Sequence, residues 1–164
     1  MMAALFAIIT APLQADWQDE VTSRQPDPSF LTIRPVHLSF QINWNGKINS
    51  GHMNMLFGGE DDRYPSHFIT QIYGASTGLA RSLYPYDYSF TSFLKYGSYL
   101  PSMFTSSETT SKGRTDTSNW YGPTVRSRET FIPSRGGSGS KKKNSTFAFR
   151  KAPIYDFASA RIYL

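Results

Sequence analysis

Two histidines could lie together on one face of a predicted β-hairpin. Residues 36–57 alternate apolar and polar side chains on both sides of Asn45-Gly46, a dipeptide that favours a tight type I′ turn. With a two-residue turn, Ser39 would face His52, and His37 would lie diagonally from His52. Two imidazoles can hold zinc or another divalent metal only with at least one or two further ligands.

The further ligands could come from the loop that follows this hairpin. It carries the acidic run Glu60-Asp61-Asp62, and His67 lies just beyond it. A metal-dependent hydrolase that uses His37 and His52 is therefore one hypothesis. The alternative is that both histidines are simply solvated on the polar face of a sheet.

Other reactive side chains show no spacing typical of an enzyme. Serine is so abundant that serine–histidine pairs arise by chance, and no Gly-x-Ser-x-Gly motif is present. The carboxylates are scattered, with no spacing that indicates an acid–base pair. Residues 136–141, GGSGSK, lack the glycine before lysine and the hydroxyl residue after it that a phosphate-binding loop needs. We therefore expect no catalytic residues and no cofactor.

The positive charge of the chain is concentrated in one segment. Six basic residues and no acidic residue lie in residues 135–151, and without them the net charge of +5 becomes −1. Lys141, Lys142 and Lys143 could contact an anionic membrane surface or a cell-envelope polyanion. The alternative is that they are solvated, because residues 133–144 have the Gly/Ser-rich composition of a flexible loop. No aromatic residue interrupts the lysine run, so a specific nucleic-acid partner is not expected.

Aromatic residues offer a different kind of site. The chain has 12 Phe, 10 Tyr and 3 Trp, and several of them fall in predicted strands. They could line a cavity for an apolar ligand in a curved sheet, or they could form its core. The proposed ligand-binding residues are Trp44, Tyr86, Tyr88, Phe90 and Trp120.

The elements that would position these residues are mainly β-strands. The sequence predicts a curved antiparallel sheet or partial barrel that opens with the hairpin and includes one or two short helices. In the hairpin, Val36, Leu38, Phe40, Met53 and Met55 would face the core. Further strands are predicted at residues 67–73, 86–94, 115–121 and 125–131.

Two short helices are predicted as well. Residues 75–83 place Leu79 and Leu83 on one face, and residues 154–164 could begin with Asp156 as the N-cap.

The N-terminal region predicts export. Residues 1–15 form an apolar run that is typical of a secretory signal peptide and is too short to span a bilayer. The basic residues that usually begin such a signal are missing, because no Lys or Arg precedes Arg24. The alternative is a buried strand or helix. Residues 16–35 would be a polar linker, and residues 36–164 a single β-rich domain. The chain has no cysteine, which excludes disulfides and thiolate metal sites.

Four features together resemble a known family. They are the strand and Asn-Gly turn of residues 40–51, the helix-like residues 77–83, Tyr99-Leu100-Pro101, and the YDFASA stretch of residues 155–160. This order is similar to domain of unknown function 3108, a family of uncharacterised bacterial exported proteins. The resemblance implies a curved antiparallel sheet facing the periplasm, without established catalytic residues. Members continue with further strands, so the resemblance also implies a truncated or short copy.

The function expected from these features is that of an exported, periplasmic or cell-envelope protein that is not an enzyme. It would be a binding or structural module for an apolar or amphipathic ligand, or for an envelope component. The alternatives are the metal-dependent hydrolase and a non-functional truncated fragment.

Overall fold

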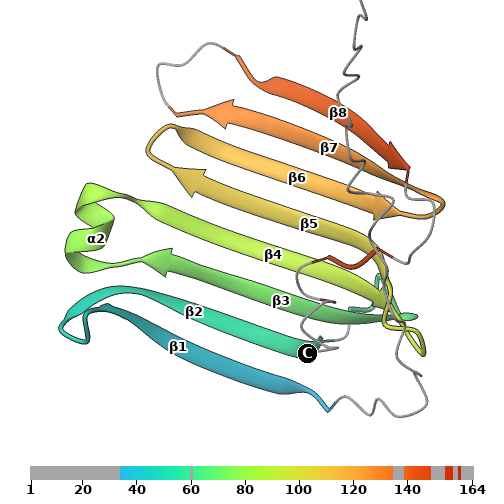
Figure 1. Ribbon diagram of the computed structural model, residues 1–164, viewed down its shortest axis with the longest axis horizontal. Coiled ribbons are helices and arrows are strands. Elements are labelled where there is room, and N and C mark those ends of the chain that lie inside the picture. Colours follow the sequence, from blue (N-terminus) through green and yellow to red (C-terminus); the bar gives the residue numbers. More distant parts are fainter. Residues whose placement is uncertain (1–33, 60, 135–138, 149–153, 157–158, 160–164) are drawn as a thin grey trace, which may run out of the picture.

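Eight antiparallel strands form one sheet in chain order (Figure 1). The computed structural model describes residues 34–59, 61–134, 139–148, 154–156 and 159. The sheet is curved and not closed, with β1 and β8 at its two edges, so the predicted curved antiparallel sheet is confirmed. The elements are β1 (Val36–Trp44), β2 (Ile48–Gly59), β3 (His67–Ser76), α2 (Gly78–Leu83), β4 (Tyr86–Lys95), β5 (Pro101–Thr110), β6 (Gly113–Tyr121), β7 (Thr124–Pro133) and β8 (Lys141–Ala148).

The predicted hairpin is present, but its register differs from the prediction. Asn45 and Gly46 both have positive φ, and the Lys47 amide donates to the Trp44 carbonyl (3.1 Å), as a tight turn requires. Trp44 pairs with Ile48, so three residues connect the strands instead of the predicted two. A β-bulge opposite Ile42 places one further residue in β2. Partners therefore differ by two residues from the predicted pairing, and this even shift keeps every side chain beyond the bulge on its predicted face.

One face of the sheet, called here the front face, carries the main apolar cluster. Met55 and Ile72 are buried at its centre, and Met53, Phe57, Tyr88 and Phe90 pack against them. The predicted core positions of Met53 and Met55 are confirmed. Those of Val36, Leu38 and Phe40 are wrong, because these side chains are 40–44% exposed on the edge strand. No described strand pairs with the outer side of β1 to cover them.

The opposite face, called the back face, has a smaller apolar cluster beneath a loop. Ile69 and Phe93 are opposed in the β3–β4 ladder, and both are buried. The ring of Tyr64 packs on Phe93 with 4.6 Å between centroids. Asp61 and Arg63 form an ion pair in the same loop (2.6 Å). The loop that was predicted as a source of metal ligands therefore covers an apolar cluster.

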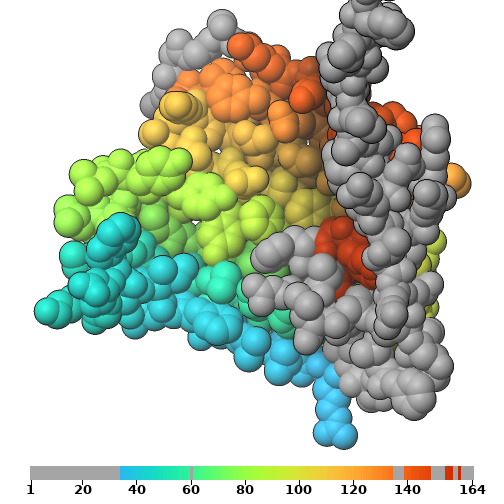
Figure 2. All heavy atoms as spheres, in the orientation of Figure 1, coloured from blue at the N-terminus to red at the C-terminus, as the bar shows by residue number. Residues whose placement is uncertain are grey.

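The C-terminal residues that the structure describes contain the predicted helix cap. The Ser159 amide donates to Asp156 Oδ1 (2.7 Å), and the Asp156 amide donates to Ser159 Oγ (2.8 Å). This reciprocal pattern confirms Asp156 as an N-cap, and Ser159 is helical. Figure 2 shows these residues, in dark red, on the front face. The rest of the predicted helix lies outside the described residues.

Other predicted boundaries differ from the structure. The helix predicted at residues 75–83 begins only at Gly78, since Ala75 and Ser76 extend β3. Strands β5 and β8 were not predicted, and Lys141 begins β8 instead of lying in a loop. The predicted signal peptide, and the linker up to residue 33, lie outside the described residues. Among the described residues, no helix has the length and apolar character needed to cross a membrane.

Candidate functional site

The two hairpin histidines do not come together. His37 is opposite Leu56 and His52 is opposite Gln41, so the two positions differ by four residues, or about 13 Å along the strands. The predicted proximity is wrong because of the register shift. Within the part of the chain that the structure describes, no group of three His, Asp or Glu residues could hold a metal ion.

A third histidine does contact a serine. Ser66 Oγ, in the loop before β3, lies 3.3 Å from Nδ1 of His67, the first residue of β3. A nucleophilic serine needs a base that is itself oriented by a third group. Among the described residues, no carboxylate hydrogen-bonds to His67, whose ring packs edge-on against Tyr64. The contact therefore lacks the arrangement of a catalytic site.

The five proposed ligand-binding aromatic residues fall at three separate places. Tyr86, Tyr88 and Phe90 share the front face of β4, Trp44 ends β1, and Trp120 lies on the back face of β6. These residues therefore do not line one shared cavity, which was one of the two alternatives that the sequence left open. Faces alternate along a strand, and the sequence alone does not show which faces of distant strands coincide.

The β4 aromatic residues form a ladder that belongs to the core. The Tyr86 and Tyr88 rings stack at 5.4 Å, Phe90 follows at 5.3 Å, and Phe104 of β5 continues the series at 6.1 Å. The Tyr86 hydroxyl donates to Glu108 Oε2 (2.6 Å). Burial, and then this hydrogen bond, raise the pKa of Tyr86. The ladder is therefore a neutral, partly buried layer.

Trp44 lines an apolar pocket between the end of the β1–β2 hairpin and α2, called here the hairpin pocket. Its volume is about 310 Å³. Six of its seven lining residues have apolar or aromatic side chains; the seven are Trp44, Ile48, Ser50, Leu79, Ala80, Leu83 and Tyr84. Leu79, Leu83 and Tyr84 are 60–77% exposed, and α2 buries none of its residues. The sequence indicated the apolar spacing of Leu79 and Leu83 but not their position beside Trp44.

Polar contacts hold α2 against the hairpin. The Thr77 amide donates to the Ser50 carbonyl (3.0 Å), and the Thr77 hydroxyl donates to Asn49 Oδ1 (3.2 Å). Gly78 has a positive φ of 55°, which a residue with a side chain rarely adopts. These hydrogen bonds from Thr77 fix the start of α2 against β2, so that the apolar residues of the helix face Trp44.

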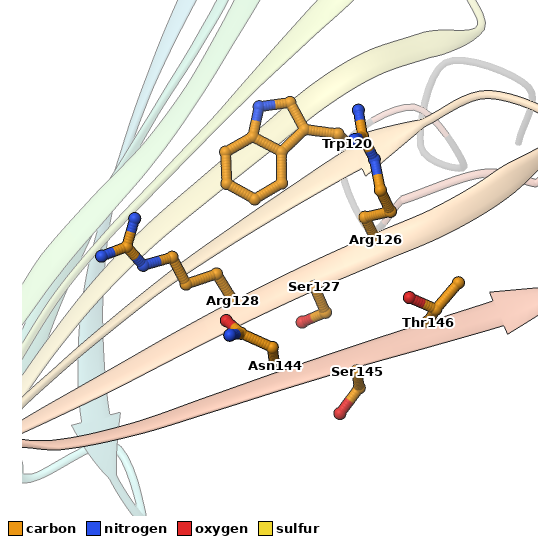
Figure 3. A pocket seen from close by; sticks show the side chains of 7 residues that line it. All are labelled: Trp120, Arg126, Ser127, Arg128, Asn144, Ser145 and Thr146. Carbon is orange, nitrogen blue, oxygen red and sulfur yellow. The ribbon is translucent and has the colours of Figure 1, made fainter.

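A second pocket, called the arginine pocket, lies across β6, β7 and β8 (Figure 3). It has a volume of about 310 Å³ and is lined by Trp120, Arg126, Ser127, Arg128, Asn144, Ser145 and Thr146. Trp120, Arg126 and Thr146 occupy one cross-strand row, and Arg128 is opposite Asn144 in the next. The side chains of these five residues lie on the back face. Sequence analysis identified Trp120 but missed both arginines, because they belong to no recognisable sequence motif.

The three lysines predicted to contact an anionic surface are exposed on the edge strand β8. Lys141 and Lys143 share the front face because they are opposite Phe131 and Glu129, whereas Lys142 points to the back face opposite Thr130. The alternation of a strand therefore divides the lysine run between the two faces. Lys142 lies on the same face as the arginine pocket.

No protein-family model matches the chain, and no curated protein or solved structure is significantly similar to it. The two pockets must therefore be interpreted from their own chemistry.

Proposed function

We propose that this protein is a non-catalytic binding module of the cell envelope that holds the apolar part of an amphipathic ligand in the hairpin pocket. The observation that carries the proposal is the gathering of large, exposed apolar side chains around one cavity. Trp44 is 74% exposed and Leu83 is 77% exposed. Apolar surface that is exposed and contiguous is typical of a binding site, whereas isolated apolar residues need no such explanation.

The size of the pocket limits the ligand. A volume of about 310 Å³ is at the lower end of the range for small-molecule sites. It suits a small apolar group or the end of an alkyl chain. Burying that group would remove the exposed surfaces of Leu79, Leu83 and Trp44 from water, which is the main driving force for binding.

The surroundings of the pocket suggest the polar part of the ligand. Lys47 lies in the hairpin turn directly before Ile48, is exposed, and has no ion pair with a described residue. Arg81 on α2 is already paired with Asp87 (2.6 Å). Lys47 is therefore the cation available to an anionic head group, and an amphiphile such as a fatty acid fits both features.

Export to the envelope is a part of the proposal that rests on the sequence. The apolar residues 1–15 and the resemblance to domain of unknown function 3108 support it. A fusion to alkaline phosphatase, which is active only after export, tests it. An inactive fusion, in cells where the same reporter with a known signal peptide is active, would contradict export.

Binding is tested with Trp44 as the reporter. The double variant Trp17→Phe/Trp120→Phe leaves Trp44 as the only tryptophan. Titration with lauric acid below its critical micelle concentration should shift the emission to shorter wavelength and reach saturation, because the indole becomes desolvated.

Matched variants make this experiment specific. In the same background, Leu79→Ser/Leu83→Ser should abolish the spectral shift. Ile132→Ser changes an apolar residue on β7, far from the pocket, and should preserve it. An emission spectrum that does not change across the titration, in a chain that remains folded by circular dichroism, would refute the proposed function.

A further inference from the structure

The arginine pocket combines positive charge with an exposed aromatic ring. Arg126 and Arg128 are two residues apart on β7, so their Cα atoms lie about 7 Å apart and their side chains leave the same face. Both are exposed, and neither forms an ion pair with a described residue. Guanidinium groups bind carboxylates and phosphates through two parallel hydrogen bonds.

The described residues that line this pocket include no acidic side chain that could neutralise its charge. On the same face of β6, the carboxylate of Asp116 is already bound by Arg114 at 2.8 Å. Lys142 adds another cation to this face two residues from Asn144. The site therefore has an excess of positive charge that an anionic ligand would compensate.

Trp120 supplies a flat apolar surface beside these charges. It is opposite Arg126 in the β6–β7 ladder, and its side chain remains 37% exposed on the face away from the main core. In Figure 3 the indole stands on the same side of the sheet as both guanidinium groups. The amide of Asn144 and the hydroxyl of Thr146 complete the pocket with groups that both donate and accept hydrogen bonds.

We propose that the arginine pocket binds an acidic sugar unit of a polysaccharide. Arg126 and Arg128 hold the carboxylate, Trp120 packs against the sugar ring, and Asn144 and Thr146 bond its hydroxyl groups. Single-stranded nucleic acid is the less suitable ligand. Its binding grooves offer successive aromatic platforms, whereas Trp120 is the only aromatic ring among the described residues that line this pocket.

The test uses the full chain with Trp17→Phe/Trp44→Phe, so that Trp120 alone reports binding. Tetragalacturonate should quench Trp120 fluorescence to saturation, and neutral maltotetraose should not. Arg126→Gln/Arg128→Gln should weaken binding of tetragalacturonate at least tenfold. Arg126→Lys/Arg128→Lys should restore only part of that loss, because lysine retains the charge without the paired hydrogen bonds.

The matched control is Lys95→Gln/Lys112→Gln, which removes the same charge from exposed positions outside the pocket and should leave binding unchanged. Equal loss in this control would show non-specific attraction and refute the site. A chain that is folded by circular dichroism but shows no response to tetragalacturonate, or binds oligothymidylate more tightly, would also refute it. The Trp44 titration reports the hairpin pocket separately, so failure of one proposal does not imply failure of the other.

Discussion

The two halves of this sheet have the same backbone pairing but different side chains. One row of directly opposed front-face residues crosses all eight strands; it is Leu38, Met55, Ile72, Phe90, Ser106, Thr117, Glu129 and Lys143. The first four residues are apolar, and the last four are polar or charged. The first half is therefore stabilised mainly by burial of apolar surface, and the second half mainly by the hydrogen bonds of its ladders.

The two edges repeat this difference. The nine residues of β1 include no Lys, Arg, Asp or Glu, and its apolar side chains remain partly exposed. Strand β8 begins with three lysines, which discourage the addition of another strand. The two candidate pockets follow the same division, since the apolar one lies beside β1 and the cationic one includes β8.

The largest expected effect tests whether stability is concentrated in the first half. Ile72 is 1% exposed, so Ile72→Ala should reduce the free energy of unfolding by about 3 kcal/mol through lost burial and a cavity. Ile132→Ala, on β7 at 38% exposure, should cost less than about 1 kcal/mol. Urea denaturation measures both changes. Equal losses would contradict the comparison.

An intermediate effect concerns a partly buried tyrosine of the second half, Tyr121. Burial, and then the negative charge of Asp156, raise the pKa of Tyr121 to about 12. An unfolded tyrosine titrates near pH 10. The folded state holds its proton more tightly, so the contribution of Tyr121 is fully present below pH 10 and is lost as the pH rises to about 12.

Replacing this tyrosine should therefore make the protein less sensitive to alkali. Tyr121→Phe should reduce the loss of stability between pH 9 and pH 12 by on the order of 1 kcal/mol, after allowance for partial solvent screening. Thermal unfolding across this pH range measures the effect, with the exposed Tyr84→Phe as control. Identical pH profiles for Tyr121→Phe and the unchanged protein would show that the Tyr121 hydroxyl is not desolvated.

The smallest effect concerns the ion pair beside α2. Arg81 and Asp87 are both nearly half exposed, and the hydrogen bond from Arg81 is the main cause of the lowered pKa of Asp87. The lowered pKa contributes stability above the unfolded value, and this contribution is lost as the pH falls through the folded value. In Arg81→Gln the pKa of Asp87, measured by NMR titration, should rise, while stability at pH 7 changes little. A large loss of stability would show that the pair fixes α2.

Local patterns in the sequence determined several parts of this protein. The alternation around Asn45-Gly46 predicted the hairpin and the faces of Met53 and Met55, because side-chain period and turn geometry act within a few residues. Asp156 was predicted as a helix cap for the same reason. Strands β5 and β8 were missed because their Ser, Thr and Lys residues lack apolar alternation, and pairing with β4 and β7 is what defines them.

Only the tertiary structure decided what the candidate sites contain. The longer turn and the bulge beside Ile42 together move His52 away from His37, and no residue type in the sequence predicts this shift. Arg126 and Arg128 meet Trp120 because β6 and β7 pair in one register, and α2 meets Trp44 because Thr77 bonds to β2. Each of these contacts depends on partners in another strand or helix. A local pattern specifies the shape of one segment, whereas the joint packing of all segments decides which side chains become neighbours.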